Sequence, residues 1–241
     1  MKYALVGDFH SNDLMKLEMA LDSIDPDVLV CLGDFDAVKT IKKFMELEER
    51  CIKAGKQVVK VIGNHDYSFL TGFEIESRTF IEKKYNQLRE ELLSSDAEKK
   101  YLEVMVRQET IFLDEKKFGK KYQTVIVHGA YDGDLSSYSS CPDDLKILWC
   151  RLLFHEDFRK NFEVMQKNKD VIMIRGHDHL PRYVYGVNGT SAPANAWKDG
   201  VEFEVEDGRM HLIEPGSIYG NWFAVIDTGN ELPVLKFHTS K

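Results

Sequence analysis

Short apolar runs alternate with longer amphipathic segments along the first 62 residues of the chain. The apolar runs, which are typical of buried strands, are Tyr3–Val6, Val28–Leu32 and Val58–Ile62. Between them, apolar residues recur at intervals of three and four over Ser11–Ile24 and Val38–Ala54, as on one face of a helix. This order predicts β-α-β units, and therefore a largely parallel sheet with helices on its faces.

Local signals predict where these two helices begin and end. Ser11 or Asn12 is expected to cap the first helix, because short polar side chains accept hydrogen bonds from N–H groups at a helix N-terminus. Gly55 follows the second amphipathic segment, and glycine commonly ends a helix at this position.

Residues 67–121 interrupt the alternation of strands and helices. Ile81, Tyr85, Leu88 and Leu92 repeat at helical spacings, and a second helix is expected at about 97–106. The segment is dense in Lys and Glu, as solvated helix faces usually are. We therefore expect a helical insertion at about 67–121 within a single domain of residues 1–241. A spacer that does not touch the functional site is the alternative interpretation.

The pattern changes again after residue 121. Tyr122–Val127 and Val171–Ile174 are predicted strands, with two helices expected between them near 143–154 and 156–168. From Arg182 onward, short strand patterns alternate with turn signals such as Asn188-Gly189, Asp207-Gly208 and Gly229-Asn230. These strand patterns are Tyr183–Val187, Val201–Val205, Met210–Ile213, Trp222–Ile226 and Pro233–Phe237. The last third is thus expected to be mainly antiparallel and to supply a second sheet.

The composition indicates which kinds of partner and which cellular compartment to expect. Of 241 residues, 43% are hydrophobic and 30% charged, and the formal net charge is −8. This charge argues against general binding to duplex nucleic acid, which depends on Lys and Arg. We expect no membrane association, because no apolar run approaches the roughly 20 residues that span a bilayer and no signal-peptide pattern is present. The cysteines form no CxxC motif, which favours reduced thiols and a cytoplasmic location: Cys31, Cys51, Cys141 and Cys150.

Polar clusters follow five of the predicted strands. They are Asp8-Phe9-His10, Gly33-Asp34, Gly63-Asn64-His65-Asp66, His128-Gly129 and Gly176-His177-Asp178-His179. Ligands bind at the carboxyl ends of the strands in open α/β sheets. The clusters contain five of the eight histidines, which packing alone does not explain. We therefore predict one binuclear metal site with the ligands Asp8, His10, Asp34, Asn64, His128, His177 and His179.

The ligand types indicate which ions this site takes. Carboxylate, imidazole and amide oxygen ligands suit Mn, Fe, Zn, Ni or Co rather than a thiolate-bound ion, and we expect two divalent ions, with Mn favoured. Two ions about 3.5–4 Å apart hold the attacking and leaving oxygens of a phosphoryl transfer, and a water between them would act as hydroxide near neutral pH.

In order and spacing, the five clusters resemble the five motifs of the calcineurin-like metallophosphoesterase superfamily. The resemblance covers residues 3 to about 226, apart from 67–121. Pro215-Gly216-Ser217 also resembles a turn of the compact bacterial and archaeal phosphodiesterase branch. The resemblance implies a four-layer α/β/β/α sandwich with mixed sheets, in agreement with the strand pattern.

The resemblance also implies a role for each motif residue. The ligands of the first metal would be Asp8, His10 and His179. Those of the second metal would be Asn64, His128 and His177, and Asp34 would bridge the two ions. His65 would bind no metal, but would donate to the leaving oxygen or stabilise the phosphoryl charge. Asp66 would orient His65, as a buried carboxylate orients an imidazole in other hydrolases.

Two departures from the protein phosphatase branch of this superfamily disfavour a phosphoprotein substrate. That branch has Asp-Arg-Gly after its second motif and Gly-His-Thr as its last motif, whereas this chain has Asp34-Phe35-Asp36-Ala37 and Gly-His-Asp-His. Arginines that bind phosphate must therefore come from elsewhere. The candidate substrate contacts are Asn12, Arg175 and Arg182, which flank the first and last motifs. His155 and His211 lie in helix and strand patterns and are expected to be structural.

The sequence predicts a cytoplasmic, metal-dependent phosphoesterase. It would hydrolyse a small phosphate mono- or diester by in-line attack of a metal-bound hydroxide. A nuclease or a cyclic-nucleotide phosphodiesterase is the alternative among enzymes. A non-catalytic scaffold is a more remote alternative, because scaffolds of this fold lack ligands and all seven are present here. Homo-oligomerisation is left open.

Overall fold

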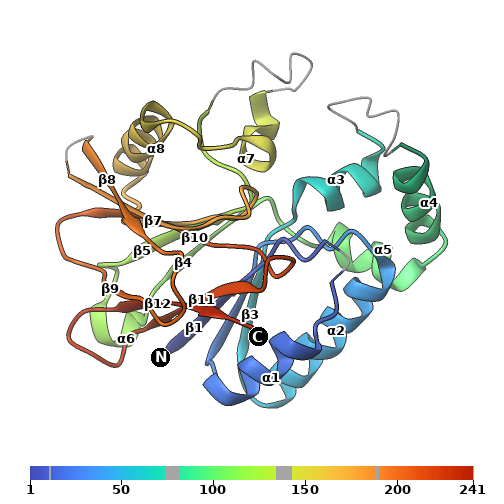
Figure 1. Cartoon of the computed structure of the whole chain (residues 1–241), viewed down its shortest axis with the longest axis horizontal. Coiled ribbons are helices and arrows are strands. Elements are labelled where there is room, and N and C mark those ends of the chain that lie inside the picture. Colours follow the sequence, from blue (N-terminus) through green and yellow to red (C-terminus); the bar gives the residue numbers. More distant parts are fainter. Residues whose placement is uncertain (11, 74–81, 134–142, 188–189, 241) are drawn as a thin grey trace.

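The computed structural model describes residues 1–10, 12–73, 82–133, 143–187 and 190–240. These residues form two mixed sheets of six strands that pack face to face, with helices on the outer face of each sheet (Figure 1).

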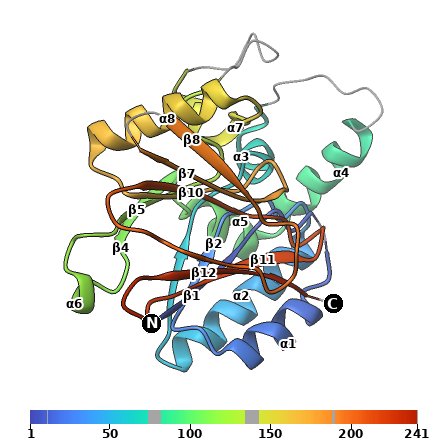
Figure 2. The same ribbon diagram turned by 60° about the vertical axis from the view of Figure 1, so that its left-hand side comes forward.

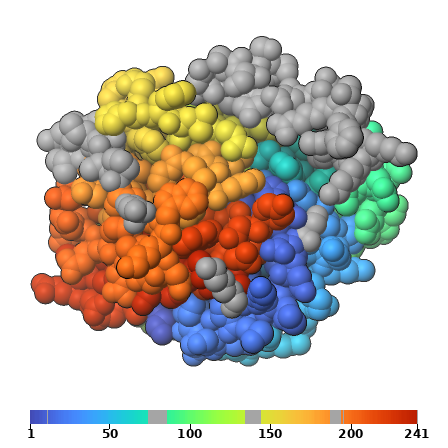
Figure 3. Space-filling model, in the orientation of Figure 1, coloured from blue at the N-terminus to red at the C-terminus, as the bar shows by residue number. Residues whose placement is uncertain are grey.

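The first sheet joins the beginning and the end of the chain. Its strands are β1 (Lys2–Val6), β2 (Val28–Cys31), β3 (Gln57–Lys60), β9 (Glu202–Glu204), β11 (Trp222–Asp227) and β12 (Val234–Thr239). They lie in the order β3-β2-β1-β11-β12-β9. β1, β2 and β3 are parallel, as the alternation of strands and helices predicted. β11 pairs with β1 in the antiparallel sense and places Ala224 opposite Leu5. Accordingly, the blue N-terminal and red C-terminal segments lie against one another on the surface (Figure 3).

The second sheet comes from the middle and later parts of the chain. Its strands are β4 (Gln108–Phe112), β5 (Gln123–Val127), β6 (Ile172–Ile174), β7 (Pro181–Val187), β8 (Thr190–Asn195) and β10 (Met210–Pro215). They lie in the order β4-β5-β6-β10-β7-β8. The central strands β5, β6 and β10 are parallel, and the outer strands pair in the antiparallel sense.

Helices cover the outer faces and one end of the sandwich. They are α1 (Met15–Ile24), α2 (Val38–Lys53), α3 (Asn64–Thr71), α4 (Glu82–Leu93), α5 (Asp96–Glu103), α6 (Glu115–Phe118), α7 (Lys146–Trp149) and α8 (His155–Asn168), with a 3-10 turn η2 (Asp143–Leu145) before α7. Figure 2 shows α8 above the second sheet and α1 and α2 below the first, with the two sheets between them.

Alternate strand residues pack into different layers of the core. In β1, Leu5 packs in the cluster between the two sheets, whereas Val6 packs in the cluster with α1 and α2. In β5, Ile126 lies between the sheets, whereas Val125 packs with Phe162 of α8. Because successive side chains of a strand point to opposite faces, each sheet contributes to two interfaces. The predicted four-layer α/β/β/α architecture is thereby confirmed.

The last third of the chain does not supply a sheet of its own, so that expectation was wrong. β7, β8 and β10 complete the second sheet, whereas β9, β11 and β12 extend the first sheet from β1. Which sheet edge a late strand joins depends on long-range packing, and its local sequence carries no signal for this choice. β8 was not expected, because Ser191–Ala194 has little strand propensity. It is an edge strand, where its Pro193 is tolerated. The predicted Asn188-Gly189 turn lies outside the described residues.

Residues 67–121 are not wholly helical, contrary to the prediction. α4 and α5 occur close to where helices were expected, but β4 follows them and pairs with β5 in the second sheet. Leu92 of α4 and Leu102 of α5 are buried in the same core cluster as Phe69 of α3. The two helices therefore pack on the rest of the domain.

The first helix begins later than predicted and without the predicted cap. α1 starts at Met15, whose backbone N–H donates to Oδ1 of Asp13 at 3.1 Å, and its N-cap residue Leu14 makes no side-chain cap. Asn12 instead donates from its side-chain amide to the carbonyl of Ile218, at 2.7 Å, and Ser11 lies outside the described residues. The second helix ends at Lys53, two residues before Gly55, as expected.

The expectations about the cysteines and about membrane association can be compared with the structure only for the described residues. Cys31, Cys51 and Cys150 are buried, and Cys141 lies outside the described residues. Among the residues that the structure describes, no helix is long and apolar enough to cross a membrane.

His211 of β10 is fully buried and has a structural environment, as its position in a strand pattern suggested. Its Nε2–H donates to the carbonyl of Glu206 at 2.9 Å, and the hydroxyl of Tyr183 donates to its Nδ1 at 2.7 Å. Burial lowers the pKa of this imidazole to about 4. The folded protein therefore holds His211 neutral at pH values where the unfolded chain takes up a proton.

We predict that His211 makes the protein less stable in mild acid. Because its folded pKa lies below the ordinary value of about 6.5, unfolding becomes easier as the pH falls below 6.5, and the loss is complete below about 4. His211→Gln should remove up to roughly 3 kcal/mol of this pH dependence. Urea unfolding at pH 7.5 and pH 4.5 measures it, with exposed His155→Gln as control. Equal pH dependence in the two variants would contradict the prediction.

Candidate metal centre

The five motif clusters meet where β1, β2, β3, β5 and β6 end, and most of their ligands sit on left-handed turns. Positive φ values between 45° and 72° occur at Asp8, His10, Asp34, Asp36, His177 and His179. This conformation is uncommon for residues other than glycine and tends to gather at functional sites. The chain therefore bends after β1, and this bend brings the side chains of Asp8 and His10 toward one place.

Two glycines leave room for the carboxylates at these strand ends. A Cβ on Gly63 would collide with the carboxylate of Asp34. A Cβ on Gly176 would lie 2.8 Å from Oδ2 of Asp8, also too close. The glycines that begin these two motifs are therefore needed for space beside the buried acids.

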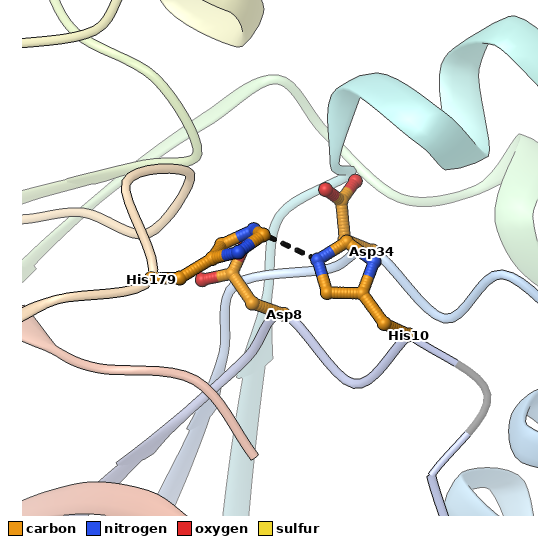
Figure 4. A group of neighbouring side chains, drawn as sticks. All are labelled: Asp8, His10, Asp34 and His179. Carbon is orange, nitrogen blue, oxygen red and sulfur yellow. Dashed lines mark hydrogen bonds and ion pairs between the residues drawn. The ribbon is translucent and has the colours of Figure 1, made fainter. Parts of the chain in front are cut away.

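One group of candidate ligands consists of Asp8, His10, Asp34 and His179, whose ligand atoms all lie within 4.8 Å of one another. Figure 4 shows Asp8 and His10 on one loop and Asp34 and His179 on two others, with a dashed line between the two imidazoles. Nε2 of His10 is 2.8 Å from Nε2 of His179, and Oδ1 of Asp8 is 3.5 Å from the latter nitrogen. Such a convergence of acceptor atoms is what a cation site requires.

A second group shares Asp34 and adds His128 and His177. Oδ1 of Asn64 lies 2.9 Å from Nε2 of His128 and 3.0 Å from Nδ1 of His177. All four residues are buried. The structure therefore brings together all seven side chains that the sequence suggested as ligands, in two groups with Asp34 common to both.

Hydrogen bonds fix which imidazole nitrogen is available in three of the four candidate histidines. His128 donates from Nδ1 to the carbonyl of Leu32 at 2.6 Å, and His177 donates from Nε2 to the carbonyl of Trp149 at 3.0 Å. His10 places Nδ1 2.6 Å from Oδ2 of Asp36. In each ring the other nitrogen faces the candidate ligand group. This arrangement, with one nitrogen held by an acceptor and the other free to coordinate, is typical of metal-binding histidines.

The carboxylate of Asp34 lacks a full set of partners. Oδ1 accepts from the backbone N–H of His65 at 3.0 Å. Oδ2 is buried and has no hydrogen-bond donor among the described residues, although Nε2 of His128 is 3.3 Å away. Burying a charged oxygen without a partner is costly. A divalent cation would satisfy it, so the residues present fit a metal site.

Burial and charge act in opposite directions on the acids of this centre. Burial raises the pKa of Asp8 to about 6. Burial also opposes ionisation of Asp34, but the neighbouring histidines, His128 first, lower the pKa of Asp34 well below its usual value. Each carboxylate therefore depends on nearby positive charge to stay ionised, and divalent cations would supply more of it.

Asp36, rather than Asp66, holds the imidazole of His65. Nδ1 of His65 is 2.7 Å from Oδ1 of Asp36, whose other oxygen contacts His10. Asp66 instead accepts backbone N–H groups of Asp34 at 2.7 Å, of Phe35 at 3.0 Å and of Gly63 at 3.1 Å. The predicted orienting role of Asp66 was therefore wrong. As the third residue of α3, Asp66 points back at its own N-terminus, as in a capping box.

The His65 side chain is the most open of the motif histidines, with 40% of its surface exposed. Partial burial lowers its pKa, but the carboxylates of Asp34 and Asp36 raise it to about 10. Without other cations this imidazole is positively charged, and cations bound at Asp34 would weaken that effect. His65 is thus placed to meet a ligand at the mouth of the centre.

The two candidate substrate arginines contact the protein itself, contrary to expectation. Arg175 is fully buried. Arg182 is only 17% exposed and pairs with Asp178 and Glu214. Asn12 also directs both ends of its amide to the protein, since its oxygen accepts from the backbone of Asp13. None of the three is free to contact a substrate in this conformation.

A different arginine, Arg151, lies beside the ligands and remains partly open. Its Nη1 donates to the carbonyl of His177 at 3.2 Å and is 3.5 Å from Oδ1 of Asp178. The side chain is 39% exposed. Its Nε and Nη2 have no hydrogen-bond partner within the described part of the chain.

Comparison with known proteins identifies the family. The domain description "Calcineurin-like phosphoesterase superfamily domain" matches residues 1–229. This chain belongs to the calcineurin-like phosphoesterase superfamily. A metallophosphoesterase from Sphaerobacter thermophilus has a similar fold, with 19% identity and a TM-score of 0.66 over 99% of this chain and 88% of that one. A hypothetical protein from Pyrococcus horikoshii OT3 is similar, with 12% identity, a TM-score of 0.58 and the same coverage. The curated proteins gave no match.

Sequence reasoning missed Asp36 and Arg151 in this member of the superfamily. Asp36 stands two residues after Asp34. This short spacing was a signal in the sequence that both carboxylates could lie at the centre. Arg151 lies between the fourth and fifth motifs and had no local signal, because its position depends on how 149–152 runs along the last motif.

We predict that Asp36→Asn lowers the phosphoesterase activity expected of a member of this superfamily. An amide oxygen accepts from only one imidazole at this site, so either His10 or His65 loses its partner. Loss of such outer partners costs about 10- to 100-fold in activity or metal affinity. Steady-state kinetics with saturating Mn measures kcat, and Asp13→Asn, on the exposed surface, is the control. An unchanged kcat would contradict the role assigned to Asp36.

Proposed function

We propose that this protein is a phosphoesterase that uses two divalent metal ions to hydrolyse a small phosphate mono- or diester. The observation that carries the proposal is the buried carboxylate of Asp34, which is common to two groups of ligand atoms. Membership of the calcineurin-like phosphoesterase superfamily supports the class of reaction.

The two groups suggest how the ligands divide between the ions. The first ion would be held by Asp8, His10 and His179. The second would be held by Asn64, His128 and His177, with Asp34 a ligand of both. The mixed oxygen and imidazole donors favour Mn, and also suit Fe, Zn, Ni or Co. When bound, such ions would acidify a coordinated water and offset the charge of the phosphoryl group.

His65 is the proposed acid of the reaction. Because Asp36 occupies its Nδ1, Nε2 remains to donate a hydrogen bond or a proton to the leaving oxygen. Asp36 also favours the positively charged form of the ring, which stabilises negative charge as the ester bond breaks. Asp66 would support the reaction only by fixing the backbone that carries Asp34.

Arg151 is the proposed contact for the phosphoryl oxygens. Arg151 lies beside His177 and His179, and its Nε and Nη2 donors have no hydrogen-bond partner among the described residues. Guanidinium donors match the spacing of two phosphate oxygens. A positive charge at the mouth favours a monoester dianion over a diester monoanion, so we expect monoesters to be the better substrates.

The activity is tested by a substrate panel run with EDTA and with Mn, Ni, Mg or Zn added back. We expect no turnover in EDTA and metal-restored hydrolysis of p-nitrophenyl phosphate above that of its bis ester. Single-stranded DNA and cyclic nucleotides in the panel test the nuclease and cyclic-nucleotide phosphodiesterase alternatives. No turnover of any ester by protein carrying two metal equivalents would favour a scaffold.

Two variants separate metal binding from catalysis. Asp34→Asn should lower the metal content at both sites and abolish activity, because both ions lose a charged ligand. His65→Ala should keep two metal equivalents and lose about 10²- to 10⁴-fold in kcat, the usual contribution of a general acid. Metal analysis of the dialysed proteins alongside kinetics distinguishes the two outcomes. Retained activity in both variants would refute the assignment.

Arg151 is tested through its charge. Arg151→Met should raise KM for p-nitrophenyl phosphate about tenfold or more, since a hydrogen bond to a charged group contributes roughly 1.5–3 kcal/mol. Arg151→Lys should recover part of the loss, and the bis ester should be less affected. Arg50→Met on the surface of α2 is the matched control. Equal KM values for Arg151→Met and Arg50→Met would contradict the proposed contact between Arg151 and the substrate.

A further inference from the structure

Arg175 lies directly before the last motif, at the end of β6, and is completely buried. A buried guanidinium is costly unless every donor is paired. It is too deeply enclosed to contact a substrate. Its role must therefore be sought in the groups that it holds.

The partners of Arg175 come from three separate loops and from strand β10. Nε donates to the carbonyl of Gly129 at 2.5 Å, and Nη2 donates to the carbonyl of Cys150 at 2.9 Å. Nη1 donates to Oδ2 of Asp178 at 2.7 Å and also contacts Glu214 of β10. One side chain thus links two backbone carbonyls and two carboxylates.

Each of these loops carries or supports a candidate metal ligand. Gly129 directly follows His128, and Asp178 stands between His177 and His179. Cys150 directly follows Trp149, whose carbonyl accepts the Nε2–H of His177. The guanidinium therefore contacts the neighbour of every histidine ligand that comes from the second sheet.

A second arginine closes this network. Glu214 pairs with Arg175 and also lies 2.7 Å from Nε of Arg182. Arg182 is 3.2 Å from Oδ2 of Asp178, and the backbone N–H of Leu152 donates to the same oxygen at 3.1 Å. Oδ2 of Asp178 is thus held from three directions, by Arg175, Arg182 and the backbone N–H of Leu152.

The last motif needs such support because of its backbone. His177 and His179 both have positive φ, with Asp178 between them. Residues in this conformation persist only where the surroundings hold them. The buried network contacts the peptide segment at Asp178, between the two strained residues, and so resists its relaxation.

We propose that Arg175 is a positioning residue for the metal centre: through its four partners it sets the spacing of the loops that carry His128, His177 and His179. The inference rests on the proposed function only in that these histidines bind metal. The planar, five-donor guanidinium is needed, because a lysine ammonium cannot reach two carbonyls and two carboxylates in one plane.

The test compares Co²⁺ binding to the full-length wild type, Arg175→Met and Arg175→Lys. Co²⁺ affinity is measured by titration, and the visible absorption of the bound ion reports ligand geometry. We expect at least one of the two equivalents to bind about 10- to 100-fold more weakly in Arg175→Met, with a changed spectrum. Arg175→Lys should recover little of the affinity.

Two further variants keep the test decisive. Glu214→Gln preserves the shape of the site and should weaken binding in the same direction if Arg175→Met does not fold. Leu235→Ala creates a cavity in β12, in the core between the sheets, and controls for a general loss of stability. Its unfolding free energy is measured beside that of the other variants, and its Co²⁺ affinity and spectrum should match the wild type.

The outcomes separate this inference from the proposed function. If the wild type binds two equivalents, and Arg175→Met and Glu214→Gln bind them with the same affinity and spectrum, the positioning role is refuted. An equal loss of binding in Leu235→Ala would refute it too. If the wild type binds no metal, the proposed function itself fails. Metal binding without ester hydrolysis would refute the proposed function alone.

Discussion

The arrangement of this site follows from one constraint. Carboxylates that are buried where several strands end must stay ionised. Asp8 and Asp34 are almost fully buried, and one oxygen of Asp34 has no hydrogen-bond donor within the described residues. Burial alone would favour their protonated forms. The surrounding imidazoles oppose this, and in the proposed function two divalent cations complete the compensation. Gly63 and Gly176 follow from the same constraint, because a side chain at either position would occupy the space of a carboxylate.

The strained turns that deliver the ligands are supported from behind by polar groups that never reach the site. Asp66 collects three backbone N–H groups around Asp34. Arg175 supports the last motif in a similar way, by donating hydrogen bonds to carbonyls and carboxylates. Both are fully buried and multiply hydrogen-bonded, so substitution would leave several polar groups unpaired. Asp36 and Arg151, in contrast, act on the open side of the centre, where a substrate would arrive.

The two-sheet architecture explains why ligands so far apart in sequence meet. The first sheet contributes Asp8, Asp34 and Asn64 from the ends of its parallel strands, and the second contributes His128, His177 and His179 in the same way. Because the sheets pack face to face, their strand ends open toward a common space. The turn through Gly216 carries the chain from β10 to β11 and so joins the two sheets beside this space. There the backbone N–H of Ile218 donates to the carbonyl of Gly7, and that of Tyr219 donates to the carbonyl of Asp8.

The sequence alone determined the β-α-β units and the seven residues that converge, because strand periodicity and strand-end chemistry are local properties. The four-layer class came from the resemblance of its motifs to those of the superfamily. It did not determine which sheet β7 to β12 would join, since strand pairing is decided by the edges left open elsewhere. It also misassigned Asp66 and Arg175, whose charged side chains look the same in sequence whether they face a substrate or the backbone. Only the tertiary structure decided that, through burial: Asp36 and Arg151 keep open surface, whereas Asp66 and Arg175 have none.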